Sequence, residues 1–132
     1  IKSTVSGKRI MIIDDSIVRG TTLKKLVTML RDAGAKEVHV RIGSPPIIAP
    51  CYYGVDMKSR DQFIANKHTV DEIRQIIGAD SLGYISIAGL VEAIGFKESD
   101  LCLACVNGKY PTVIPGEVHR FQSTLSHSFD KP

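Results

Sequence analysis

The sequence contains no tryptophan, only three cysteines, and no apolar run approaching the ~20 residues of a membrane-spanning helix. No signal peptide opens it, and it has no block of like charges of the kind that binds nucleic acid. The net charge of +3 is mild for 132 residues. We therefore expect a cytoplasmic protein that binds neither a membrane nor a nucleic acid. The charge is compatible with an anionic small molecule.

The length allows one domain at most. Residues 1–7 are rich in serine, threonine and glycine and are predicted to be an entry linker. The patterned part of the chain covers 8–115, and residues 116–132 are predicted to be a polar, flexible tail. The chain opens on Ile1 rather than on methionine.

Two kinds of apolar pattern alternate along the chain, which favours an α/β fold with a parallel sheet flanked by helices. Three segments are predicted to be strands: 8–13, 38–42 and 82–85. Three others are predicted to be helices: 21–33, 70–77 and 87–94. A capping box at Thr69 and Glu72 opens the second helix. Since residues 10–13 are apolar without alternation, we expect a central strand that is buried on both faces.

The most informative stretch is residues 10–22, Ile-Met-Ile-Ile-Asp-Asp-Ser-Ile-Val-Arg-Gly-Thr-Thr. The strand is predicted to end at two adjacent carboxylates, Asp14 and Asp15, and a short polar loop then leads into a helix. Ligands of open α/β sheets bind at the carboxyl ends of strands, and a helix N-terminus suits a phosphate. Paired carboxylates suit a sugar diol or Mg²⁺. The stretch thus predicts a site that holds a phosphorylated sugar from both ends.

Cysteines form the second notable pattern. Cys102 and Cys105 have the spacing of a chelating pair, and Cys51 lies alone upstream. Such residues are often small buried hydrophobic side chains, and a Cys-x-x-Cys pair can also be a redox pair or half of a zinc site. A disulfide is not expected in a cytoplasmic protein. The residue pattern alone leaves these alternatives open.

Residues 10–22 resemble the 5-phosphoribosyl-1-pyrophosphate (PRPP) motif of the type I phosphoribosyltransferases. They are similar above all to the form found in the glutamine PRPP amidotransferase family. Five further segments resemble that family: 29–39, 44–46, 50–56, 73–80 and 102–111. The resemblance implies that 8–115 is the C-terminal part of a type I phosphoribosyltransferase domain, with an added cysteine-containing segment.

The resemblance also implies the residues of the site. Nine consecutive residues would bind the ribose and 5-phosphate of PRPP: Asp14, Asp15, Ser16, Ile17, Val18, Arg19, Gly20, Thr21 and Thr22. Asp14 and Asp15 would in addition bind Mg²⁺. Cys51, Cys102 and Cys105 would supply three of the four ligands of a [4Fe–4S] cluster in the intact enzyme. No residue of this chain is assigned as a catalytic acid, base or nucleophile.

The implied reaction forms 5-phosphoribosylamine from PRPP and glutamine, the first step of de novo purine biosynthesis. Its implied partners are PRPP, purine nucleotides as inhibitors, further copies of the chain in a homo-oligomer, and the missing glutaminase and transferase segments. In the family, the missing transferase segments hold the pyrophosphate in a loop and form a mobile lid. Because the sequence shows none of these segments, we expect a C-terminal fragment or one piece of a split enzyme, and we expect it to be inactive alone.

Three alternative functions belong to other classes of protein. A non-catalytic PRPP-sensing module could share the fold, but it does not explain the three cysteines or the segment 44–56. A phosphoribosyltransferase acting on a free base is not expected to contain the segment that follows Cys102. A plain zinc-binding domain predicts a fourth cysteine or histidine ligand, and the sequence offers no obvious one.

Overall fold

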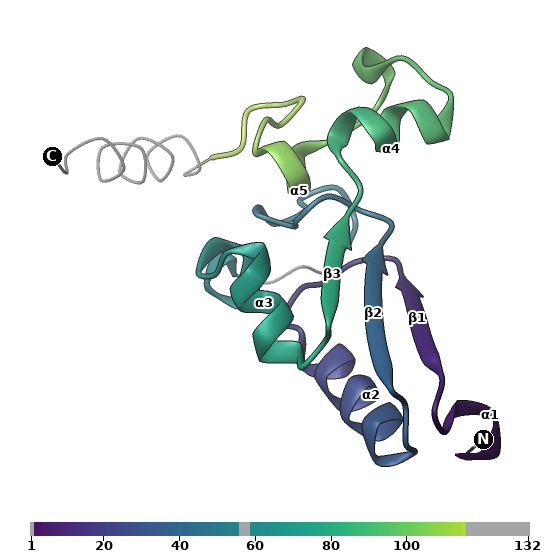
Figure 1. The fold of residues 1–132 in the computed structure, drawn as a ribbon. Helices are drawn as coiled ribbons and strands as arrows, with labels where there is room; N and C mark the ends of the chain where they lie inside the picture. The colour runs from purple at the N-terminus through teal and green to yellow at the C-terminus, as the bar shows by residue number, and fades with distance from the viewer. Residues whose placement is uncertain (1, 56–58, 116–132) are drawn as a thin grey trace, which may run out of the picture.

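The structure is a computed structural model that describes residues 2–55 and 59–115. The predicted tail, 116–132, lies outside the described residues. Three parallel strands form one sheet in the order β1 (Arg9–Asp14), β2 (Glu37–Ile42) and β3 (Ser81–Tyr84). Helices α2 (Thr21–Asp32) and α3 (Val70–Ile77) lie together on one side of this sheet (Figure 1). The predicted α/β fold with a parallel sheet is confirmed.

The ends of the helices follow from their capping residues. Thr69 opens α3 with the predicted capping box, since its hydroxyl accepts from Glu72 N and the Glu72 carboxylate accepts from Thr69 N. Gly78 ends that helix with φ +77°. Ser86 caps α4 (Ile87–Ile94) in a similar way by accepting from Gly89 N. The predicted helices over 21–33, 70–77 and 87–94 are therefore confirmed to within a residue.

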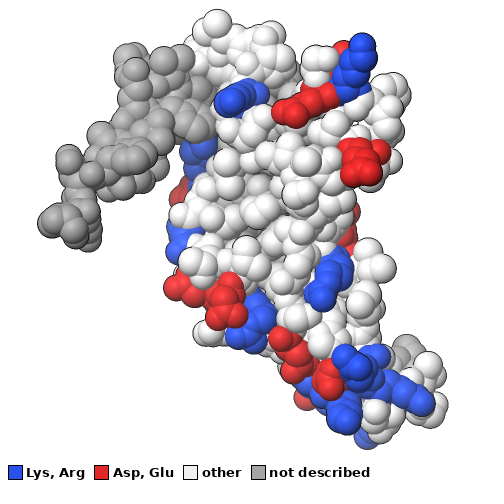
Figure 2. Space-filling model, turned by 45° about the horizontal axis from the view of Figure 1, so that its top comes forward, with Lys and Arg blue, Asp and Glu red and all other residues white. Residues whose placement is uncertain are grey.

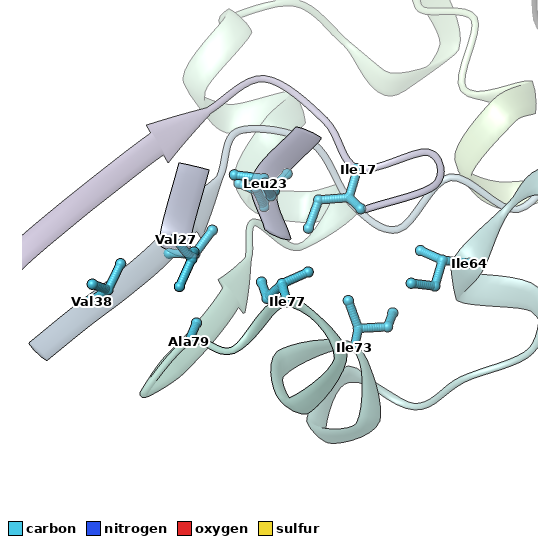
Figure 3. Close-up of a cluster of buried hydrophobic side chains, with 10 residues drawn as sticks. Ile17, Leu23, Val27, Val38, Ile64, Ile73, Ile77 and Ala79 are labelled. Carbon is cyan, nitrogen blue, oxygen red and sulfur yellow. The ribbon is translucent and has the colours of Figure 1, made fainter. Parts of the chain in front are cut away.

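The core lies between the sheet and the two helices that cover it. Val38 and Val40 of β2 are fully buried, and both belong to one cluster with residues of α2 and α3. Figure 3 shows Val38 of β2 with Val27 of α2 and Ile77 of α3. Burying a side chain of this size stabilises the fold by about 1.5–3 kcal/mol. The complete buried cluster consists of Ile17, Leu23, Val27, Val38, Val40, Ile42, Ile64, Ile73, Ile77 and Ala79.

The prediction of a central strand over 10–13 is wrong for this structure. Among the described strands, β1 pairs only with β2 and lies at the edge of the sheet. Met11 is 59% exposed and Ile13 is 78% exposed, whereas Ile12 packs against the core. The physical reason is that α2 and α3 cover one face only, so alternate residues of β1 have no covering element. An apolar run indicates a capacity for burial on both faces, not the order of strands.

The remaining elements lie at the two ends of the strands. Residues 1–7, predicted to be a linker, contain a short helix, α1 (Lys2–Val5), whose Val5 is buried. Beyond the carboxyl ends of the strands lie α4 and α5 (Ala104–Asn107) (Figure 1). Three short 3-10 turns complete the described structure: η1 (Arg60–Gln62), η2 (Ile64–Asn66) and η3 (Glu98–Asp100).

The surface carries both signs of charge. On the face seen in Figure 2, basic and acidic side chains are interspersed near the two ends of the molecule, and the middle is largely uncharged. This differs from the continuous basic stripe of a nucleic-acid-binding surface. Within residues 2–55 and 59–115, none of the helices has the length and apolarity needed to cross a membrane.

Candidate substrate-binding site

A pocket of about 530 Å³ opens where β1 ends. Asp14 is the last residue of β1, residues 15–20 form a loop, and Thr21 begins α2, which confirms the predicted order of strand, loop and helix. All nine residues predicted to bind PRPP line this pocket, together with Leu23, Gln62 and Phe63. The structure therefore brings the whole predicted set together around one cavity.

Two contacts hold the loop of residues 15–20 against the core. Ile17 is 2% exposed and points into the core next to Ile64 and Ile77 (Figure 3). The carbonyl of Val18 accepts a hydrogen bond from Ile64 N at 2.8 Å. Ile17 was predicted among the substrate-binding residues, but its side chain anchors the loop, and only its backbone remains for a ligand.

The backbone angle and the surroundings of Gly20 explain why this residue is glycine. It has φ +76° and ψ −6° as the N-cap of α2. A Cβ built there would lie 3.3 Å from Ile64 Cδ1 and 3.5 Å from Ile77 Cγ2. The missing side chain would therefore point into the core. The left-handed backbone and the packing beside Ile64 and Ile77 both favour glycine at position 20.

The N-terminus of α2 lies at the pocket and provides hydrogen-bond donors. The first N–H groups of an α-helix have no intrahelical partner, and Gly20 has no side chain that could accept from them. Ser16, Thr21 and Thr22 add hydroxyl groups to the same pocket wall. Backbone N–H groups and the positive end of the helix dipole together favour an anion such as a phosphate.

The two carboxylates are held by local hydrogen bonds. Asp14 Oδ1 accepts from Asp15 N at 3.0 Å, and Asp15 Oδ1 accepts from Ser16 N at 2.7 Å. Each carboxylate uses its Oδ1 for this bond, so Oδ2 is left for a ligand. The pocket thus has an acidic end suited to sugar hydroxyls or Mg²⁺ and a helix N-terminus suited to a phosphate.

Three lining residues were not predicted from the sequence. Leu23 is buried in the first turn of α2, and Phe63 is 1% exposed. Gln62 accepts a hydrogen bond from Arg19 Nε at 3.1 Å and a second one from Arg19 Nη2. No local sequence pattern indicated that Gln62 would contact Arg19, which lies 43 positions upstream.

The segments that carry the three cysteines lie side by side. Ile48 N and Ala49 N both donate to the Cys105 carbonyl, at 2.8 and 3.1 Å. Tyr110 OH donates to the Pro50 carbonyl at 2.7 Å, and its ring centroid lies 5.3 Å from that of Tyr52. The segment around Cys51 is therefore packed against the segment that contains Cys102 and Cys105.

All three thiols are free: Cys51 and Cys105 are half-buried, and Cys102 is exposed. Burial raises the pKa of Cys105, and the neighbouring thiol groups of Cys51 and Cys102 raise it further. In the described part of the chain, no three Cys, His, Asp or Glu side chains are arranged so that they could hold one metal ion. The close approach of the three sulfur atoms stays a prediction.

Comparison with solved structures defines the class of fold. The chain resembles glutamine PRPP amidotransferase from B. subtilis complexed with ADP and GMP, with a TM-score of 0.81 and 53% identity over 88% of this chain and 26% of that one. A structure described as the allosteric regulatory enzyme of purine biosynthesis gives a TM-score of 0.82. The fold is accordingly part of the type I phosphoribosyltransferase fold.

Sequence comparison identifies the family. The chain is 58% identical over 120 residues to amidophosphoribosyltransferase of Archaeoglobus fulgidus and 60% identical over 114 residues to that of Methanocaldococcus jannaschii. It is 55% identical to the Bacillus subtilis enzyme over 118 residues. In the stretch that it spans, this chain belongs to the amidophosphoribosyltransferase family. It spans about a quarter of the length of these relatives, 24% to 26%. No protein-family profile matches the chain.

Proposed function

We propose that the full-length protein is an amidophosphoribosyltransferase and that this chain supplies its site for the ribose 5-phosphate part of PRPP. In the reaction, the bond from the ribose C1 to pyrophosphate breaks and pyrophosphate leaves with the electron pair. A bond from C1 to ammonia forms, ammonia loses a proton, and 5-phosphoribosylamine results. Glutamine would supply the ammonia in a part of the protein outside this chain. This is the first step of de novo purine biosynthesis.

The observation that carries the proposal is the single pocket at the end of β1, lined by all nine motif residues. The N-terminus of α2 and the hydroxyl groups of Thr21 and Thr22 would bind the 5-phosphate. Asp14 and Asp15 would bind the ribose hydroxyls. Holding the sugar at both ends would orient C1 for attack, and orientation is a major source of rate enhancement.

Asp14 and Asp15 would also hold Mg²⁺ in the full-length enzyme. The donor set fits, because both carboxylates line the pocket and each leaves one oxygen free of its local hydrogen bond. The ion would supply positive charge where pyrophosphate departs.

Purine nucleotides are proposed to bind the full-length protein as inhibitors. The B. subtilis neighbour is described as complexed with ADP and GMP. A nucleoside monophosphate carries the same ribose 5-phosphate unit as PRPP, so it could occupy the same pocket. A homo-oligomeric assembly of the full-length protein is proposed from the family resemblance.

The test of the PRPP site uses the full-length protein and saturating ammonia, which makes turnover independent of glutamine. We expect Asp14→Asn and Asp15→Asn to lower phosphoribosylamine formation by about 10²-fold, because each removes charge at the reacting end of the sugar. Asp32→Asn is the matched control, since Asp32 is an exposed carboxylate at the opposite end of α2. Full turnover by both pocket variants would contradict the proposal. PRPP binding without turnover would instead indicate a sensing module.

Cys51, Cys102 and Cys105 are proposed to supply three thiolate ligands to a [4Fe–4S] cluster in the full-length protein. The donor chemistry fits, because thiolates are the usual ligands of such clusters and the two cysteine segments pack together. The cluster would stabilise this part of the fold rather than take part in the reaction.

The cluster test measures composition instead of activity. The full-length protein, purified without oxygen, should contain about four iron atoms and four acid-labile sulfides per chain, and Cys105→Ser should lose both. Ser99→Ala, in an exposed turn of the same region, should keep them. Protein that contains one zinc ion and no sulfide would contradict the cluster and support a zinc site.

A further inference from the structure

The pocket wall contains an arginine whose pairing differs from that of three other arginines in the described part of the chain. Arg9, Arg31 and Arg74 each form an ion pair with a carboxylate, at 2.6, 2.5 and 2.8 Å. Arg19 instead donates from Nε and Nη2 to the side-chain oxygen of Gln62. It forms no ion pair with another described residue. The positive charge of Arg19 is therefore held in place without being neutralised.

The geometry of the guanidinium fixes the orientation of the Gln62 amide. A guanidinium group has five N–H donors and no acceptor. The oxygen of Gln62 must therefore face Arg19, and its NH₂ group keeps two donors. Because Nε and Nη2 share this one acceptor, Nη1 and the second hydrogen of Nη2 remain for a ligand.

The backbone around Gln62 is fastened independently of Arg19. This backbone segment consists of residues 60–66. Phe63 is 1% exposed and anchors the segment in the interior. Ile64 N donates to the Val18 carbonyl at 2.8 Å, and Asn66 Nδ2 donates to the Ile48 carbonyl at 3.0 Å. The Gln62 side chain thus extends from a fixed point of the structure.

We propose that Gln62 is a positioning residue that holds the Arg19 guanidinium against the pocket, so that its full positive charge is available to a phosphate of the ligand. This proposal rests on the proposed function, since it assumes that the pocket takes a ribose 5-phosphate unit. A carboxylate at position 62 would hold Arg19 equally well but would compete with the ligand phosphate for its charge. An amide holds the arginine and leaves the charge to the ligand.

The test measures binding of ribose 5-phosphate and of ribose to the full-length protein by calorimetry. Gln62→Leu removes the acceptor and should weaken ribose 5-phosphate binding by roughly threefold to tenfold. Gln62→Glu keeps the shape but adds a negative charge, and it should weaken binding at least as much. Neither change should alter the affinity for ribose, which lacks the phosphate. A structural role of Gln62 would change the affinity for both ligands.

A double-substitution cycle shows whether Gln62 acts through Arg19. Arg19→Gln alone should weaken ribose 5-phosphate binding, and adding Gln62→Leu to it should have no further effect. Gln75→Leu is the matched control, because Gln75 also bonds a side chain through its amide, Asp71 at 2.8 Å, but lies on the exposed face of α3. It should bind as the unchanged protein does.

Three outcomes overturn the inference while the proposed function stands. The first is an unchanged affinity of Gln62→Leu for ribose 5-phosphate, and the second is a higher affinity of Gln62→Glu for it. The third is that the losses of affinity caused by Arg19→Gln and Gln62→Leu add up in the double variant. Each applies when the unchanged protein binds ribose 5-phosphate. Absence of ribose 5-phosphate binding in the unchanged protein would overturn the proposed function itself. The two failures are therefore distinguishable.

Discussion

At the scale of single residues, Gly20 joins the substrate loop to α2 and meets two separate demands. Its φ of +76° lies in the left-handed region, which costs a side-chain-bearing residue roughly 1–2 kcal/mol. A Cβ at this position would also make a tight contact with Ile64, at 3.3 Å, and an ordinary one with Ile77, at 3.5 Å. Because Gly20 packs against the core, we expect a larger substitution such as Gly20→Val to disturb the fold as well as ligand binding.

Gly20→Ala should lower the free energy of unfolding by about 1–3 kcal/mol, since it adds a tight contact to the backbone strain. Gly95→Ala is the matched control: Gly95 has φ +77° and no neighbouring atom within 4 Å of the added Cβ. Urea denaturation of both variants should show a larger loss for Gly20→Ala. Equal losses would mean that the core accommodates the extra methyl group and that only the backbone angle matters.

Asp80 links three elements through one carboxylate oxygen. Its Oδ2 accepts from Val38 N at 2.6 Å and from Arg31 Nη2 at 2.5 Å. These bonds, the one from Val38 N foremost, hold the pKa of Asp80 below the ordinary value of 3.8. A lowered pKa in the folded state contributes stability above the ordinary value, and that contribution is lost as the pH falls through the folded-state pKa.

Asp80→Asn should therefore be less stable than the unchanged protein at neutral pH, and the difference should shrink as the pH falls below 3.8. The measurement is the thermal midpoint of both proteins across the acid range, with Asp32→Asn as the control for loss of an exposed carboxylate. A difference that does not change with pH would show that Asp80 acts by its shape and hydrogen bonding rather than by its charge.

At the scale of elements, helix α3 shows how far local sequence determines structure. Its capping box, its apolar face and its terminal glycine are all encoded within ten consecutive residues, Thr69 to Gly78. It packs against α2 through Ile73 and Ile77, which are both 1% exposed. The helix also supports the substrate loop, because Ile77 lies beneath Gly20.

Thr69→Ala should lower the free energy of unfolding by about 1 kcal/mol, because it removes the side-chain acceptor for Glu72 N. Thr28→Ala is the control: Thr28 lies within α2, where its hydroxyl donates to the Lys24 carbonyl four residues earlier. Alanine favours helix interiors, so this control should be neutral or slightly stabilising. If Thr69→Ala is also neutral, the capping box contributes little to the fold.

The elements could be predicted because their signals are local, and the same reasoning explains what was missed. The nine motif residues are contiguous, so one stretch indicated most of the pocket. Gln62 could not be found in this way, since it meets Arg19 across 43 positions of sequence. The edge position of β1 was also missed, because its apolar residues show what the strand could bury and not which elements cover it. Strand order depends on long-range packing that a single sequence does not display.

At the scale of the whole molecule, the proposed function assigns to the described structure the ribose 5-phosphate side of a larger reaction site. Its pocket holds an acidic end and a helix N-terminus, both suited to ribose 5-phosphate. The family resemblance implies that the pyrophosphate loop, the mobile lid and the ammonia source belong to other segments. The chain spans about a quarter of its amidophosphoribosyltransferase relatives, 26% for the A. fulgidus enzyme.

We therefore expect the 132-residue chain by itself to show no synthetic turnover. Without the pyrophosphate loop, the charge that develops on the leaving pyrophosphate would lack the protein donors of that loop, and without the lid, water would reach the reacting carbon. The assay is phosphoribosylamine formation from PRPP with saturating ammonia, which removes the need for a glutaminase, and the full-length protein is the positive control. Turnover by the chain alone would mean that the groups assisting pyrophosphate departure lie within these residues. The pocket at the end of β1 would then have to be reinterpreted as the complete reaction site.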